Sequence, residues 1–355
     1  MKVLFLTQNL DRTSSNLRVV EDWLNALAQR MEAVTVLAFN VGEHQLRENI
    51  KIINVRSHGK VPRVALLFSF AVSMTRATVL KQYDVVLAHM VPMYALLALP
   101  WARLSRSPLA LWYTSHGNSR LGRLAAHLVD VGMTASIESY PIGTDKVVAI
   151  GHGIDVSRYP LAVNTGNHPV IVMAGRITPL KQMHLAVEAM SHPLLRDHYL
   201  QPKLKIAGET FYEDDKLYLE DIHRVIEQKQ LSERVEFVGG VPGEEMPEFY
   251  GGADVCLSLR SSSAMDKVGL EAMASGIPIV TNNCSYRGLL KDYESALMMQ
   301  NDDVESLASQ ISRIINDEPA AREMGINLRD RVKAEHGIDR FADRVIDVLD
   351  AVSKT

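Results

Sequence analysis

The sequence lacks several features that would place it outside the ordinary globular class. Cysteine occurs only twice in 355 residues, as Cys256 and Cys284, without the spacing of metal ligands, which argues against a disulfide framework or a zinc site. The longest apolar segment, Val64–Thr75, covers about 12 residues, whereas a membrane-spanning helix needs roughly 20. The amino terminus, Met1–Thr7, has no cleavage site and predicts a first strand rather than a signal peptide. We therefore expect a cytoplasmic protein that can also bind peripherally to the inner face of a membrane.

Other absences concern function. No G-x-G-x-x-G follows an early strand, and this argues against a nicotinamide-dependent oxidoreductase. The sequence also has no low-complexity tract and no short-period repeat. Acidic and basic residues nearly balance, with a net charge of -4. The two signs are nevertheless unevenly distributed on either side of residue 165. The first part carries 17 Lys and Arg against 11 Asp and Glu, and the remainder carries 21 against 31. The basic first part is expected to face something anionic.

Short apolar runs alternate with helix-length periodic segments along the chain, a pattern that predicts parallel sheets covered by helices. Seven runs lie between residues 3 and 150, and six more lie between residues 169 and 299, the last being Ala296–Met299. A segment rich in Pro, Gly and Asn, residues 159–169, separates the two series. We expect two doubly wound domains, 1–165 and 166–339, facing across a cleft. The terminal segment 340–355 is expected to form an amphipathic helix that packs on either domain.

The loop that ends the first strand of the second series carries two basic residues close to a helix start. Gly175 and Arg176 leave the strand, and Lys181 follows within the same loop. Positive side chains beside the free N–H groups of a helix N-terminus suit a diphosphate. The alternative is a turn with two solvated basic residues.

A second segment, Asp266–Pro278, has the features of a buried helix with an acid inside it. Asp266 is expected to cap the helix, whose first-turn N–H groups can meet phosphate. Glu271 lies just over one turn further and is followed by small apolar residues, which indicate that the helix is largely buried. An unpaired carboxylate is costly there, so Glu271 is expected to accept hydrogen bonds from a ligand rather than to lie on a solvated face.

These segments, taken together, resemble retaining glycosyltransferase family 4. The matching blocks, in chain order, are Gly175-Arg176 with Lys181, Ile206-Ala207-Gly208, Val235–Gly239, Tyr250 with Ala253-Asp254-Val255, and Leu270–Pro278. The resemblance implies a GT-B fold of two Rossmann-like domains. It also implies that Arg176 and Lys181 hold the pyrophosphate of a nucleotide-sugar donor, and that Glu271 holds its ribose.

One block departs from the family pattern. The family has two acids eight residues apart, and Ser263 stands where the first is expected. The missing acid touches the donor sugar in the family, so Ser263 and Asp266 are candidates to contact that sugar. The Gly-rich stretch between the acids is replaced by Asp266-Lys267-Val268. These three residues are expected to contribute to donor binding, and Lys267 could add a phosphate contact.

The first half of the chain matches the family more weakly. Ser14 and Ser15 stand where the family often has a Gly pair, and they are either an acceptor-side loop or a helix cap. His89 and His116 each follow a strand. The resemblance implies that His116 faces the sugar or acceptor and assists proton transfer, while His89 is more simply a structural residue. Gly153 is expected to have an unusual backbone angle.

Basic residues gather ahead of the apolar segment Val64–Met74. A helix that contains this segment and continues to Arg76 has a narrow polar stripe of Ser69, Ser73 and Arg76, and it could lie in an anionic membrane surface. Burial against the sheet is the alternative, and it is the one we expect for the helix itself.

The sequence therefore predicts a retaining, metal-independent glycosyltransferase without a cofactor, acting on a UDP- or GDP-sugar. The acceptor is expected to be a glycan or lipid-linked molecule of cell-envelope synthesis, with an anionic membrane as a further partner and no nucleic acid. No paired acids of a metal-dependent sugar transferase are present, and two basic side chains can supply the metal's electrostatic role. A catalytically silent nucleotide-sugar-binding subunit is the alternative.

Overall fold

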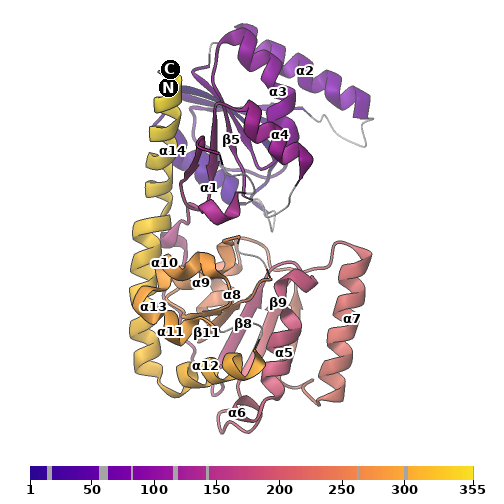
Figure 1. Ribbon diagram of the computed structural model, residues 1–355, viewed down its shortest axis with the longest axis vertical. Helices are drawn as coiled ribbons and strands as arrows, with labels where there is room; N and C mark the ends of the chain where they lie inside the picture. The colour runs from indigo at the N-terminus through magenta and orange to yellow at the C-terminus, as the bar shows by residue number, and fades with distance from the viewer. Residues whose placement is uncertain are drawn as a thin grey trace. The chain divides into compact units, whose positions relative to one another are not determined.

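The computed structural model describes residues 1–13, 18–55, 63–80, 83–114, 119–140, 144–261, 264–299 and 303–354. The chain forms two compact units, each with its own parallel sheet. Unit 1 contains Met1–Gly153 and Ile338–Thr355, and unit 2 contains Ile154–Gly337. Both are of the doubly wound α/β class that the sequence predicts (Figure 1).

Unit 1 is built on a seven-stranded sheet in the order β3-β2-β1-β4-β5-β6-β7. All neighbouring pairs are parallel. The strands are β1 (Lys2–Leu10), β2 (Ala33–Val41), β3 (Ile50–Asn54), β4 (Val85–His89), β5 (Leu109–Trp112), β6 (Val131–Thr134) and β7 (Val147–Ala149).

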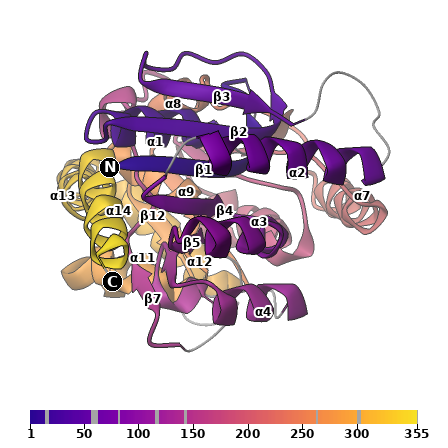
Figure 2. The ribbon, with the colours of Figure 1, turned by 90° about the horizontal axis from the view of Figure 1, so that it is seen from above.

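Helices cover both faces of this sheet, and alternate residues of the strands point to them. On one face, Val3 and Phe5 of β1 pack with α1 (Val19–Ala28) and α14 (Ile338–Ser353). On the other face, Leu4 and Leu6 pack with α2 (Arg63–Leu80), α3 (Pro92–Ser105) and α4 (Arg120–Leu128). Figure 2 shows these last three helices beside one another.

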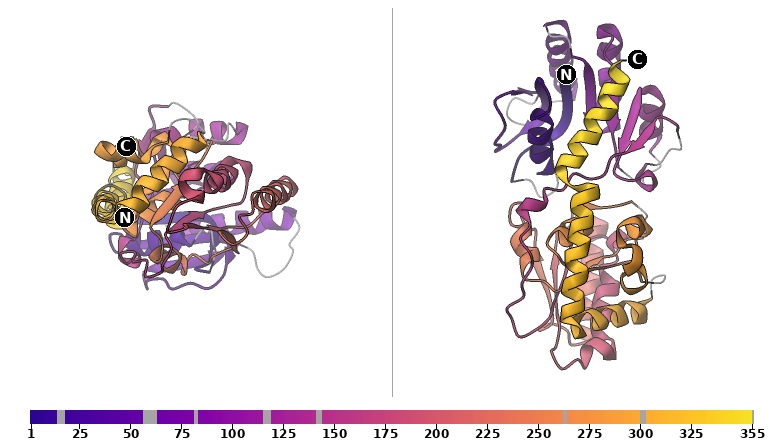
Figure 3. Two further views of the ribbon diagram at one scale, coloured as in Figure 1. Left: turned by 90° about the horizontal axis from the view of Figure 1, so that it is seen from below. Right: turned by 90° about the vertical axis from the view of Figure 1, so that its left-hand side faces the viewer.

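The last helix belongs to unit 1, although it follows unit 2 in the chain. Figure 3 shows this helix as the last part of the chain. The ring of Phe341 on α14 packs against the Trp23 ring of α1, with 4.4 Å between ring centroids. Gly153 lies against both rings at φ +64°, and a Cβ there would come within 2.7 Å of Phe341. The unusual backbone angle predicted for Gly153 is confirmed, and Trp23 Nε1 donates to its carbonyl oxygen at 3.0 Å.

The apolar segment at residues 64–74 lies in α2, and two serines of its polar stripe face the core rather than solvent. Ser73 is buried, and the Ser69 hydroxyl donates to the Val55 carbonyl at 2.7 Å. Val64 and Phe68 are exposed instead. The expected burial of the whole helix is therefore wrong for its first half. The side of the helix that faces the sheet there carries Ser69, whose hydroxyl bonds to the Val55 carbonyl, so Val64 and Phe68 are left on the outer side. No helix in the described ranges is long and apolar enough to span a bilayer.

Unit 2 is built on a five-stranded parallel sheet in the order β10-β9-β8-β11-β12. Its strands are β8 (Val170–Ala174), β9 (Lys203–Ala207), β10 (Val235–Gly239), β11 (Val255–Ser258) and β12 (Ile279–Thr281). The helices are α5 (Met183–Ser191), α6 (Pro193–Arg196), α7 (Glu213–Gln228), α8 (Met246–Gly251), α9 (Lys267–Ala274), α10 (Arg287–Leu290), α11 (Glu294–Leu297), α12 (Val304–Asn316) and α13 (Glu318–His336). Short 3-10 turns complete the unit, among them η3 (Pro179–Lys181).

One predicted strand is wrong. Residues 296–299 begin inside α11, and only a single bridge joins Met298 to Thr281 at the end of β12. The Met299 N–H donates to the Thr281 carbonyl at 2.9 Å. The run is apolar because Leu297 and Met299 are buried, and burial alone does not distinguish a strand from a helix end.

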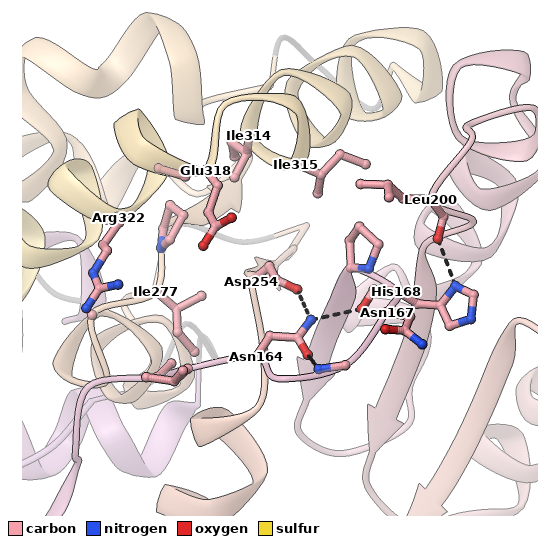
Figure 4. Close-up of a pocket in the computed structure, with 18 residues that line it drawn as sticks. Asn164, Asn167, His168, Leu200, Asp254, Ile277, Ile314, Ile315, Glu318 and Arg322 are labelled. Carbon is pink, nitrogen blue, oxygen red and sulfur yellow. Dashed lines mark hydrogen bonds between the residues drawn. The ribbon is translucent and has the colours of Figure 1, made fainter.

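The segment between the two series, residues 159–169, is fastened to unit 2 at the amino ends of its strands. Asn164 Nδ2 donates to Asp254 Oδ2 at 2.6 Å and to the His168 carbonyl at 2.8 Å. Burial is the main cause that raises the pKa of Asp254. A cavity of about 240 Å³ lies here, beside Glu318 and Arg322 (Figure 4). The sequence divides the chain at residue 165, whereas the compact units divide at 153 because of this attachment.

Candidate functional site

Lys181 and Asp266, both singled out by the sequence, meet at the carboxyl ends of β8 and β11. Strand β8 lies between β9 and β11, so the chain leaves β8 toward one side and later returns on the other. Such a topological switch point is where doubly wound sheets bind ligands. Gly175 and Arg176 directly follow β8, and residues 259–266 follow β11.

The backbone of Gly175 is positioned by close contacts that need glycine. Its φ is +126°, and its N–H donates to the Ala207 carbonyl at 2.9 Å. A Cβ on Gly175 would lie 3.1 Å from Lys181 Cε, and a Cβ on Gly208 would overlap the Gly175 carbonyl oxygen. The two glycines let the loop fold back so that Lys181 lies over the end of β8.

Lys181 is paired with Asp266 across the two strand ends. Lys181 Nζ donates to Asp266 Oδ2, and both side chains are 14% exposed. Arg260 Nη1 lies 3.7 Å from the same oxygen. The Tyr286 hydroxyl donates to Asp266 Oδ1 at 3.0 Å. The sequence did not predict Arg260 or Tyr286 as site residues, although Arg260 is a basic residue directly after a buried strand.

The expected helix cap by Asp266 is wrong. Asp266 occupies the N-cap position of α9, but its side chain makes no cap hydrogen bond. Its carboxylate turns to Lys181, because a bond between two charged groups is stronger than one to a neutral N–H. Burial alone would raise the pKa of Asp266, but Lys181 and then Arg260 oppose this, and the pKa falls to about 2. The Asp266 carboxylate thus leaves the first turn of α9 uncapped.

Glu271 is a buried carboxylate, as its sequence context predicts. It is 8% exposed on α9, so the alternative of a solvated face is wrong. The Tyr250 hydroxyl donates to Oε2 at 3.5 Å and also to the Val268 carbonyl at 3.5 Å. Lys267 Nζ lies 3.7 Å from Oε1. These contacts are long, and a carboxylate can accept about four hydrogen bonds, so Glu271 can accept more from a ligand.

Arg176 leaves the same strand end as Gly175 but turns toward α7. Its guanidinium carbon lies 5.6 Å from the centre of the Tyr212 ring. Asp215 belongs to the capping box of α7 with Tyr212. Burial would raise the pKa of Asp215, but hydrogen bonds, with the charge of Arg176 adding to them, lower it. Arg176 is exposed, so its charge is available to a ligand over the loop.

His89 in unit 1 is a core residue. It is 2% exposed, and its Nδ1 lies 3.1 Å from the Thr7 hydroxyl. The ring packs among Phe5, Trp23 and Trp112. Burial lowers the pKa of His89 to about 3, so the ring is neutral near pH 7. The structural interpretation of His89 is favoured.

Four predicted site residues lie outside the described residues, namely Ser14, Ser15, His116 and Ser263. Their roles therefore stay predictions. Among the residues that the structure does describe, no group of three or more His, Cys, Asp or Glu side chains is arranged to hold a metal ion.

The two parallel sheets, each covered by helices, define a pair of Rossmann-like domains, and comparison with known proteins identifies the fold as GT-B. The structure of Anabaena HepE in complex with UDP and glucose matches 99% of this chain and 100% of that chain, with a TM-score of 0.78 at 18% identity. A sucrose-phosphate synthase from Thermosynechococcus elongatus matches 99% and 98%, with a TM-score of 0.77 at 18% identity.

Sequence comparison finds a family match within the second unit. Residues 162–331 match the model of glycosyl transferases group 1. A GDP-mannose-dependent alpha-(1-6)-phosphatidylinositol monomannoside mannosyltransferase from Mycolicibacterium smegmatis is 26% identical over 203 residues. The match covers 55% of this chain and 51% of that protein, so the chain spans about half the length of this relative.

Proposed function

We propose that the chain is a retaining glycosyltransferase of family 4, which moves a sugar from a UDP- or GDP-sugar to an acceptor hydroxyl. The observation that carries this proposal is the cluster at the carboxyl ends of β8 and β11. There Lys181, the start of α9 and the buried Glu271 lie within a glycosyl transferases group 1 segment. A pair of basic groups suits a diphosphate. A carboxylate that can accept further hydrogen bonds suits the two hydroxyls of a ribose.

The donor diphosphate would replace Asp266 as the partner of Lys181. In the structure, the lysine pairs with the Asp266 carboxylate. A diphosphate oxygen would take the place of that carboxylate, while Arg176 approaches from the side of Tyr212 and the free N–H groups of α9 add backbone donors. The positive groups stabilise the negative charge that develops on the leaving diphosphate. They would supply the electrostatic role of a metal, so we propose a metal-independent reaction without a cofactor.

Unit 1 is proposed to hold the acceptor. His116 would assist the acceptor hydroxyl, with Ser14 and Ser15 in a loop near it, and these roles follow from the sequence resemblance. The sugar would leave the diphosphate as an oxocarbenium-like species before the acceptor hydroxyl attacks. Ser263 and Asp266 are proposed to contact the sugar, and Lys267 to support Glu271 or a phosphate.

The acceptor is proposed to be lipid-linked or a growing envelope glycan at the cytoplasmic face of an anionic membrane. The basic balance of the first 165 residues supports this location. The mycobacterial relative acts, by its name, on a phosphatidylinositol mannoside and uses GDP-mannose, whereas HepE was solved with UDP and glucose. The donor hydrolysis experiment below therefore includes both UDP-sugars and GDP-sugars.

A catalytically silent donor-binding subunit is the second candidate. Ser263 replaces the acid expected in the family. Loss of an acid that contacts the donor sugar would weaken sugar transfer more than nucleotide binding.

Donor hydrolysis in the absence of acceptor tests the proposed activity. We expect one member of a panel of UDP- and GDP-sugars to release its nucleotide slowly, with the anomeric configuration of the sugar retained. The rate should be the same with and without a chelator, because Lys181 and Arg176 carry the charge. Binding of a nucleotide sugar without turnover would favour the silent subunit, and loss of turnover on chelation would contradict the metal-independent mechanism.

A further inference from the structure

The outward face of α4 is unusual because its large side chains point to solvent. Gly122, Ala125 and Ala126 are buried against the sheet side. Leu121 and Leu124 are exposed, and so is Leu128 one turn further. A helix of a globular protein normally buries its leucines and exposes its small or polar residues. Helix α4 does the opposite, so packing within unit 1 does not explain its leucines.

The first half of α2 shows the same inversion. Val64, Leu67 and Phe68 are exposed, while Ser73 is buried and Ser69 bonds to the edge of the sheet. The buried contacts of this helix come from its other side, where Phe70 and Met74 enter the core.

Helix α3 joins the two exposed stretches into one surface. Trp101 of α3 donates from Nε1 to the Thr75 hydroxyl of α2 at 3.0 Å, and its ring meets Phe70 edge-on. On its other side α3 packs along α4, as Figure 2 also shows. Leu104 is exposed at the end of α3. We call this surface the α2–α4 face, and its apolar members are 39% to 84% exposed: Val64, Leu67, Phe68, Leu104, Leu121, Leu124 and Leu128.

The charges on the same helices have one sign. The sequences of α2, α3 and α4 contain no Asp or Glu. Arg76, Arg103, Arg120 and Arg123 are exposed among the apolar side chains, and so is His127. Asp130, two residues after the end of α4, forms an ion pair with Arg103 at 2.9 Å.

We infer that the α2–α4 face docks on the surface of an anionic lipid bilayer, with its leucines and Phe68 among the acyl chains and its arginines at the headgroups. This inference rests on the proposed location beside an anionic membrane, and it names the surface that makes the contact. Aliphatic and aromatic side chains interleaved with arginine are typical of helices that lie in a bilayer interface. Phosphate headgroups supply the negative charge that the three helices lack.

Vesicle sedimentation with two double variants tests this surface. The probes are vesicles of phosphatidylcholine alone and vesicles in which about a third of the lipid is phosphatidylglycerol. Wild type should bind the anionic vesicles and release at high salt. Arg120→Gln with Arg123→Gln should lower the partition coefficient roughly thirtyfold, since each arginine near the surface adds about one kcal/mol. Leu121→Ser with Leu124→Ser should lower it about tenfold at any salt concentration.

The matched control is Lys216→Gln with Leu217→Ser on α7, which removes one exposed cation and one exposed leucine from unit 2. It should bind vesicles like wild type. All variants should keep the thermal unfolding midpoint and the donor turnover of wild type, which separates this inference from the proposed reaction. Equal loss in the control, or full binding by both α4 variants, would place the membrane surface elsewhere. No binding of wild type at low salt, or self-association through α4 instead, would overturn the inference.

Discussion

Replacing Lys181 with alanine is expected to lower kcat for donor turnover by about a hundred- to a thousandfold. Its ammonium group lies over the end of β8, where the diphosphate is proposed to leave, and Gly175 has no side chain to keep it away. A group that meets the developing charge of the leaving diphosphate stabilises the transition state more than the bound donor. Arg176→Ala should act in the same direction, since Arg176 leaves the same loop.

The measurement is the initial rate at saturating donor, corrected for the folded fraction from thermal unfolding. Lys216→Ala is the matched control, because it removes an exposed lysine of the same unit that pairs with the neighbouring Glu213 at 2.9 Å. A Lys181→Ala rate within threefold of wild type would remove this lysine from the catalytic mechanism.

Replacing Asp266 with asparagine is expected to tighten the binding of nucleoside diphosphate about tenfold. In wild type the ligand must compete with a carboxylate for Lys181 and must approach that negative charge. Asparagine keeps the size of the side chain and removes both effects. Binding of the free nucleoside should change little, because it lacks phosphate. Calorimetric titration measures both, and weaker diphosphate binding by Asp266→Asn would show that Asp266 orients Lys181 for the phosphate.

The same variant should destabilise the unliganded protein by about 2 kcal/mol at neutral pH, since the pKa of Asp266 falls from 3.8 to about 2 on folding. A carboxyl group whose pKa is lower in the folded state stabilises the protein fully at pH values above its unfolded-state pKa. This stabilisation is lost as the pH falls through the folded-state pKa. The difference in free energy of unfolding between wild type and Asp266→Asn should therefore be full above about pH 4 and shrink toward pH 2. Urea titrations across this range measure it, and a difference independent of pH would contradict the ion pair.

The alternation of apolar runs and periodic segments was sufficient to predict the fold, because parallel sheets need buried strands and covering helices. It failed at residues 296–299, where the apolar character comes from the end of α11. The burial of Glu271 could be predicted from the small residues that follow it. The pairing of Lys181 with Asp266 could not, because the two lie 85 residues apart on neighbouring strand ends and local spacing favoured a helix cap.

The exposed leucines of α4 show another limit of sequence patterns. Periodicity identifies an apolar side of a helix and assigns it to the core. In α4 the sheet side is filled by Gly122, Ala125 and Ala126, which allow a close approach, so the leucines are left outside. In α2 a serine hydroxyl can face inward because Val55 offers it a carbonyl acceptor. Neither choice can be made before the neighbouring elements are known.

The most direct test of the donor site is calorimetric titration of wild type, Lys181→Ala and Glu271→Ala with UDP, GDP and the matching nucleosides. If Glu271 holds the ribose and Lys181 the diphosphate, Glu271→Ala should weaken nucleosides and diphosphates alike. Lys181→Ala should weaken only the diphosphates, by roughly 1.5 to 3 kcal/mol. Undetectable binding of every nucleotide to wild type, or equal affinity of all three proteins for the preferred diphosphate, would contradict the assignment of this cluster as a nucleotide-sugar site.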